Sequence, residues 1–138
     1  MANEDELQKN MTLIEYYKEQ LKTLEYQFSL IQTTIADQNR AKITLEKLNG
    51  VKEDSELLLP IGGGAFINAK IKNSSKVLYD VGDGIVIEKS IEDTIINVDN
   101  RIKELQNTEE KISNMAQQIQ NEANNVSNKV ETILSKNK

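Results

Sequence analysis

Apolar side chains recur every seven residues near both ends of this chain, and this spacing restricts the fold more than any other feature. Residues 3–49 contain neither Gly nor Pro. Within them, one row consists of Leu7, Ile14, Leu21, Phe28, Ile35 and Lys42, and a second consists of Tyr17, Leu24, Ile31, Gln38 and Leu45. Rows three residues apart are typical of the a and d positions of a coiled coil. We therefore expect a helix over 3–49, ended by Asn49-Gly50.

The C-terminal third shows the same repeat. Its first row consists of Ile91, Val98, Leu105, Ile112, Ile119, Val126 and Ile133, and its companion of Ile95, Ile102, Glu109, Ala116, Ala123, Val130 and Asn137. Ser90 is followed three residues later by Asp93, which resembles the capping box that begins a helix. The sequence therefore predicts a second helix over 90–135.

Between these segments the period changes from seven to two. Apolar residues alternate with polar ones over 67–72 and again over 77–81, and Asn73-Ser74-Ser75 and Gly82-Asp83-Gly84 are turn sequences. This pattern predicts four short strands forming two β-hairpins over 57–88.

The expected fold is α+β and mainly α, one domain over 1–138. Two helices of similar length joined by compact hairpins should run antiparallel, so that residues whose numbers add up to about 139 lie level. Four short strands cannot bury both faces of a sheet, and a two-helix coil buries only one stripe. We therefore expect a subunit of an assembly rather than a self-sufficient globule.

Composition excludes several kinds of chemistry. The chain has no Cys and no His, so it has no disulfide, no usual zinc ligand set and no Ser-His or Cys-His couple. Gly62-Gly63-Gly64 lacks the Lys-Ser/Thr of a phosphate-binding loop, so we interpret it as a backbone bend. Adjacent Glu109 and Glu110 belong to a solvated helix face without a pocket that could shift their pKa. We expect no enzyme, cofactor or metal site.

Charge and hydropathy indicate which partners and which cellular location to expect. The net charge is −5, and Lys and Arg are interspersed with Asp and Glu, which argues against nucleic acid as a partner. No stretch approaches the roughly 18 apolar residues of a membrane span. The acidic start of the chain does not resemble a signal peptide. We expect a cytoplasmic protein that contacts no membrane.

Three polar residues interrupt the helical rows. Lys42, Gln38 and Glu109 would not face one another in an antiparallel pair with level residues adding up to 139. We therefore expect no salt bridge in the seam and side chains whose polar ends reach water.

The strand region resembles one known family. Residues 59–71, LPIGGGAFINAKI, are similar to the segment after the first helix of prefoldin α-class subunits, and residues 77–90, VLYDVGDGIVIEKS, are similar to the segment that leads into their second helix. The sequence-specific likeness extends over about 57–105. Two hairpins resemble the α class, whereas the β class has one.

The resemblance implies a subunit of a hexameric co-chaperone with two α-class and four β-class chains. In that family the hairpins assemble into an intersubunit β-barrel from which coiled coils project. The coiled-coil tips capture non-native polypeptides without ATP and pass them to a group II chaperonin.

Two sets of candidate site residues follow. Those expected to bind unfolded clients at the helical tips are Leu7, Met11, Ile14, Tyr17, Val126, Val130, Ile133 and Leu134. Those expected to assemble subunits through the hairpins are Phe66, Ile67, Ile71, Val77, Tyr79, Val81, Ile85 and Ile87. The alternative function is a structural scaffold or tether that binds specific native partners. At the tips, the alternative is a coiled coil that stays closed to its last turn.

Overall fold

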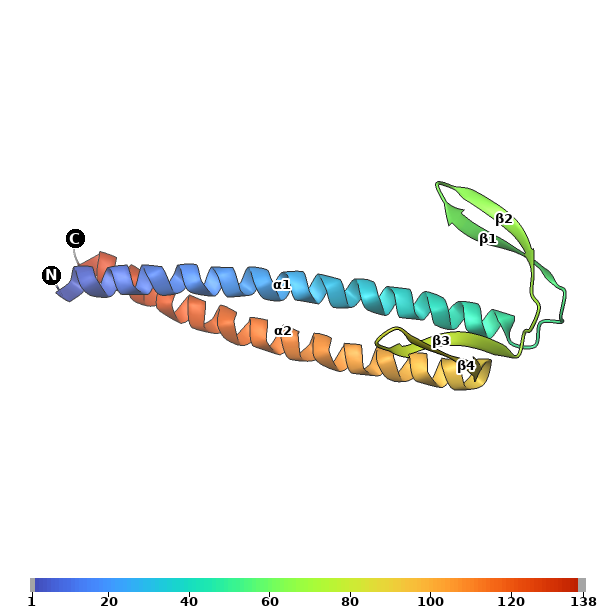
Figure 1. Ribbon diagram of the computed structural model, residues 1–138. Coiled ribbons are helices and arrows are strands. Elements are labelled where there is room, and N and C mark those ends of the chain that lie inside the picture. The colour runs from blue at the N-terminus through green and yellow to red at the C-terminus, as the bar shows by residue number, and fades with distance from the viewer. Residues whose placement is uncertain (1, 137–138) are drawn as a thin grey trace. The chain divides into compact units, whose positions relative to one another are not determined.

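The computed structural model describes residues 2–136. Its elements are α1 (Ala2–Leu48), β1 (Glu56–Gly62), β2 (Ala65–Lys70), β3 (Lys76–Gly82), β4 (Ile85–Ser90) and α2 (Ile91–Lys136) (Figure 1). Two long helices with two antiparallel hairpins confirm the predicted fold class. The chain divides into two units. We call the residues up to Thr34 and from Leu105 onward the arm unit, and Ile35–Glu104 the body unit.

In the arm unit, the first part of α1 and the last part of α2 run side by side in opposite directions (Figure 1). Glu6 of α1 and Ile133 of α2 line one hollow, and Gln20 and Ile119 line another. In both pairs the residue numbers add up to the expected 139. The predicted antiparallel register therefore holds within this unit, and the start of α1 lies beside the end of α2.

The heptad rows form the apolar core of the helices. Every row residue named from the sequence is buried or half-buried, except Asn137, which lies outside the described residues. The buried apolar side chains are Leu24, Ile91, Val98, Ile102, Ile112, Val126 and Ile133. Burying one such side chain contributes about 1.5–3 kcal/mol. The seam is thus the principal reason that these helices are stable, because their buried apolar side chains all belong to it.

Glycine determines how both hairpins turn. Gly63 and Gly64 have φ values of 59° and 76°, and Asp83 and Gly84 have values of 53° and 75°. Two consecutive residues with positive φ form the type I′ turn that best matches the twist of antiparallel strands. The glycine run therefore serves backbone conformation, as expected from the sequence.

The two hairpins have the same strand pairing, offset by twenty residues along the chain. Leu59 pairs with Ile67 in the first and Tyr79 with Ile87 in the second, and each register shifts by a bulge just before the turn. Each hairpin is a separate two-stranded sheet. Within the described residues, the outer edges of both hairpins therefore have no strand partner.

We predict that Ser90→Ala destabilises the start of α2. The Ser90 Oγ accepts a hydrogen bond of 3.1 Å from the backbone N–H of Asp93, as expected for a helix cap. Losing such a cap costs about 0.5–2 kcal/mol. Circular dichroism during denaturant unfolding at fixed chain concentration would measure this loss.

The matched control is Ser113→Ala, at an exposed position inside α2. Ala is the better helix former there, so stability should stay equal or rise. Equal effects of the two substitutions would contradict the capping role of Ser90.

Candidate functional site

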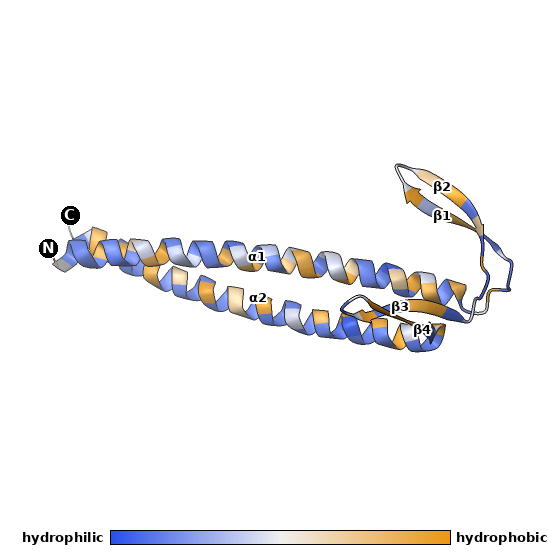
Figure 2. Ribbon diagram, in the orientation of Figure 1, coloured by the Kyte–Doolittle hydropathy of each residue, from blue (hydrophilic) through white to orange (hydrophobic). Residues whose placement is uncertain are grey.

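The first hairpin exposes apolar side chains on both of its faces. Leu59 and Ile67 share one face, and Leu58 and Phe66 lie on the other. The exposed fractions of Leu58, Phe66 and Ile67 are 63%, 60% and 53%. Figure 2 shows the apolar character of much of this hairpin. A two-sided apolar sheet with open edges is a surface that another chain could cover.

The second hairpin differs because one of its faces lies against helix. Val77 and Tyr79 are half-buried and line a hollow together with Val98 of α2 and Leu45 of α1. Leu78, on the opposite face, is 76% exposed. Of the eight predicted assembly residues, the structure leaves five exposed: Phe66, Ile67, Val81, Ile85 and Ile87. It half-buries the other three: Ile71, Val77 and Tyr79.

Arg101 of α2 fixes the inner face of this second hairpin. Its Nη2 donates a hydrogen bond of 3.0 Å to the backbone oxygen of Asp80, and its Cζ lies 4.6 Å from the centre of the Tyr79 ring. Lys89 places a second cation 5.9 Å from the same ring. Each cation–π contact contributes about 0.5–1 kcal/mol where water has access. These contacts hold Tyr79 toward α2 and so leave Leu78 facing outward.

The ion pair that Lys42 forms contradicts one expectation from the sequence. Its Nζ lies 2.8 Å from Oδ1 of Asp99, so the seam does have an ion pair in the body unit. The prediction was wrong because it considered only polar residues within the heptad rows, whereas Asp99 follows the row residue Val98. The hydrogen bond to Asp99 and the attraction of its charge raise the pKa of Lys42 above its ordinary value of 10.5. Gln38 and Glu109 are half-buried in their rows.

The raised pKa predicts how stability depends on pH. Because the folded state holds the Lys42 proton more tightly than the unfolded chain, the pair contributes fully below the ordinary pKa of 10.5. Its contribution is lost as pH rises through the higher folded-state value. A double-mutant cycle with Lys42→Met and Asp99→Asn, measured by denaturant unfolding, should give a small favourable coupling at pH 7 that disappears at strongly alkaline pH. A coupling that grows with alkaline pH would contradict this prediction.

The predicted client-binding residues come together where the start of α1 lies beside the end of α2. Met11 and Leu134 are exposed, at 54% and 50%. Four others are half-buried: Leu7, Ile14, Tyr17 and Val130. Val126 and Ile133 are buried, so the seam is closed at these two positions. The structure therefore offers two apolar side chains at once and keeps the rest in or beside the seam.

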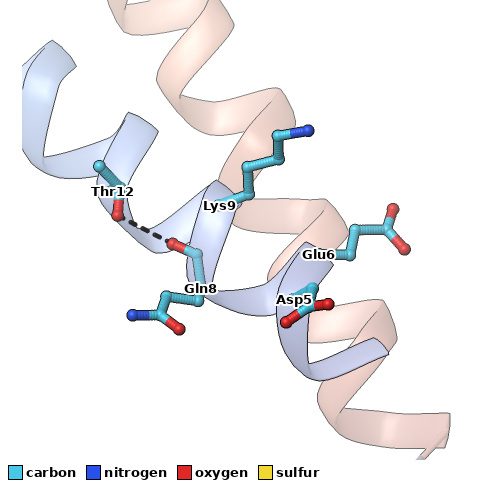
Figure 3. A pocket seen from close by; sticks show the side chains of 5 residues that line it. All are labelled: Asp5, Glu6, Gln8, Lys9 and Thr12. Carbon is cyan, nitrogen blue, oxygen red and sulfur yellow. Dashed lines mark hydrogen bonds between the residues drawn. The ribbon is translucent and has the colours of Figure 1, made fainter. Parts of the chain in front are cut away.

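Polar side chains cover the outer side of α1 near its start. Asp5, Glu6, Gln8, Lys9 and Thr12 line a shallow hollow there. Figure 3 shows that their polar ends point in different directions and that the hydroxyl of Thr12 donates to the backbone oxygen of Gln8. Because these groups do not converge, the hollow has no geometry for catalysis.

Neither a metal centre nor a membrane-spanning helix is found among residues 2–136. In that range, no group of three or more acidic, Cys or His side chains is arranged to hold a metal ion. No helix in the same range is both apolar and long enough to cross a bilayer.

Sequence reasoning missed Arg101 and Asp99. Asp99 could have been found by extending the search from the heptad rows to their immediate neighbours. Nothing in the sequence points to Arg101, because its partner Asp80 lies 21 residues away and the contact depends on how the hairpin folds back on α2.

Comparisons with known proteins agree on one family. A family model described as "Prefoldin subunit" matches residues 17–136. The chain is 30% identical over 102 residues to "Prefoldin subunit alpha" of Methanococcus maripaludis, covering 74% of this chain and 69% of that one. It is 29% identical over 106 residues to the protein of the same name from Archaeoglobus fulgidus, covering 77% of each.

A solved structure shares the fold. A chain of filamentous PFD from Methanocaldococcus jannaschii, determined by cryo-EM, superposes with a TM-score of 0.74 at 22% sequence identity. The match covers 83% of this chain and 95% of that one. With the family match over residues 17–136, these findings show that the chain belongs to the prefoldin family of chaperone subunits.

Proposed function

We propose that this chain is an α-class subunit of a cytoplasmic co-chaperone. It assembles through its hairpins with β-class subunits, two α to four β. The complex captures non-native polypeptides at the ends of its arm units without ATP and transfers them to a group II chaperonin. The proposal includes no catalytic step, no cofactor and no contact with nucleic acid or membrane.

One observation carries the assembly part of the proposal. The hairpins expose large apolar side chains next to unpaired strand edges, with Leu78 at 76% and Phe66 at 60%. Exposed edges are templates for pairing with another chain. Closing a β-barrel between subunits would pair those edges and cover those side chains in one step.

We predict that Phe66→Lys with Ile85→Lys prevents assembly. Burying an ammonium group without a partner is costly enough to weaken association by at least about a hundredfold. Native mass spectrometry of the full chain with a β-class partner should show a hexamer for the natural chain and free subunits for the variant. Tyr26→Lys is the control, because Tyr26 is 65% exposed on α1 and outside the hairpins.

Two results would contradict the assembly proposal. The first is a natural chain that sediments as a stable monomer at micromolar concentration, both alone and with the partner. The second is a Phe66→Lys, Ile85→Lys variant that still forms the hexamer.

Client capture is supported by what lies at the end of the arm unit. Met11 and Leu134 expose flexible apolar side chains where the start of α1 lies beside the end of α2. Such side chains suit a surface that accepts many partners. The half-buried seam residues beside them would add apolar area when the end of the coil opens.

We predict that Met11→Gln with Leu134→Gln impairs capture while assembly stays intact. Each substitution removes apolar area that a bound client would cover, so roughly tenfold more complex should be needed to suppress aggregation. Light scattering of a chemically denatured client, diluted into assembled complex, would measure this.

Leu30→Gln is the control, because Leu30 is as exposed as Leu134 but lies away from the end of the unit. Unchanged suppression by the double variant would contradict capture at these positions.

The rival function is a scaffold that tethers native partners. It differs in what the complex binds: a scaffold recognises specific folded proteins, whereas the proposed chaperone binds unrelated unfolded chains and ignores their folded forms. The same scattering assay with several unrelated clients distinguishes the two.

A further inference from the structure

Asn10, near the start of α1, is a polar residue of the helical seam. It precedes Tyr17 by seven residues and so belongs to the row that continues with Leu24. Asn10 is half-buried, whereas Asn3, one repeat earlier, is exposed. Asn10 is therefore the residue of this row where the seam begins. In the observed register it lies level with the stretch of α2 between Val126 and Val130.

The amide nitrogen of Asn10 (Nδ2) is buried without a hydrogen bond to any described residue. Lys42 is the contrasting case, because its polar end is paired with Asp99. A buried donor without an acceptor has lost its bonds to water and gained nothing in return. This cost applies only while the helices are closed around Asn10, because water reaches the amide when they separate.

We propose that Asn10 keeps the end of the arm unit opening, by destabilising the closed seam beside Val126 and Ile133. Compared with an apolar residue at the same position, an unsatisfied buried donor shifts the equilibrium between closed and open forms toward the open form by roughly ten- to a hundredfold. Opening exposes seam residues that the closed form buries. The role of this opening in client capture rests on the function proposed above. The opening itself does not depend on that function.

The missing hydrogen-bond partner of Asn10 argues against the interpretation that this residue only sets the register of the two helices. A polar residue can specify which residues of two helices face each other when it pairs across the seam. Asn10 makes no such pair through Nδ2. An uncompensated amide nitrogen at the position where this row enters the seam changes the balance between closed and open forms instead.

The test is amide hydrogen exchange of the full chain, comparing Asn10→Leu with the natural protein. We expect exchange over residues 5–17 and 126–134 to slow by at least about tenfold, because the orphan donor is removed and apolar contact is gained. The control is Asn114→Leu, at an exposed position of α2, which adds the same side chain and the same helix propensity outside the seam. Asn10→Ala removes the donor without adding bulk and should slow exchange to a smaller extent.

Each outcome of the exchange experiment either supports or overturns the proposal. Equal exchange in Asn10→Leu and Asn114→Leu overturns the proposal, and so does a change of oligomeric state or register in Asn10→Leu without slower exchange. Slower exchange in both Asn10→Leu and Asn10→Ala supports it, whereas slower exchange in Asn10→Leu alone overturns it, because the added apolar contact then accounts for the effect. Slower exchange together with weaker aggregation suppression supports capture by the opened seam as well. Slower exchange with unchanged suppression supports the opening and counts against the seam residues as the client-binding surface.

Discussion

Burial of one apolar stripe along each helix is the interaction on which the structure depends. The buried apolar residues of α1 and α2 belong to the heptad rows, whereas most of the exposed side chains of both helices are polar. A stripe of this kind is satisfied by a single partner helix, so the helices need nothing more once they are paired. What remains uncovered lies in the hairpins, where apolar side chains face water on both sides of the first hairpin and on the outer side of the second. This difference is the basis for proposing that subunits assemble through the hairpins and that the ends of the helices have another role.

The sequence predicted those parts of the structure that local periodicity controls. Rows such as Leu7–Lys42 and Ile91–Ile133 identify helices because one residue in seven must return to the same side of the coil. The hairpins were predictable because Gly62–Gly64 and Gly82–Gly84 supply the positive φ values of two tight turns. The antiparallel register followed from the similar lengths of the helices, and it is borne out in the arm unit.

Contacts between distant segments could not be predicted in the same way. Arg101 meets Asp80 and Tyr79 because the second hairpin folds back on α2, which no spacing in the sequence encodes. Asp99 pairs with Lys42 from a position just outside the rows. The exposure of Met11 and Leu134 also had to be seen in the structure, because both lie next to row residues and could have been covered by them.

Polar residues within the seam have different effects according to whether they find a partner. Lys42 reaches Asp99, so the charge is retained at little cost and the pair adds a link between α1 and α2 in the body unit. Asn10 leaves its amide nitrogen unbonded in the arm unit. The proposed function has two requirements: helices that stay paired where subunits assemble, and helices that separate where a non-native chain is admitted. The paired Lys42 in the body unit and the unpaired amide nitrogen of Asn10 in the arm unit fit these requirements within the helical seam, while the second buried polar atom without a partner among the described residues, the Tyr79 hydroxyl, belongs to a hairpin and not to the seam.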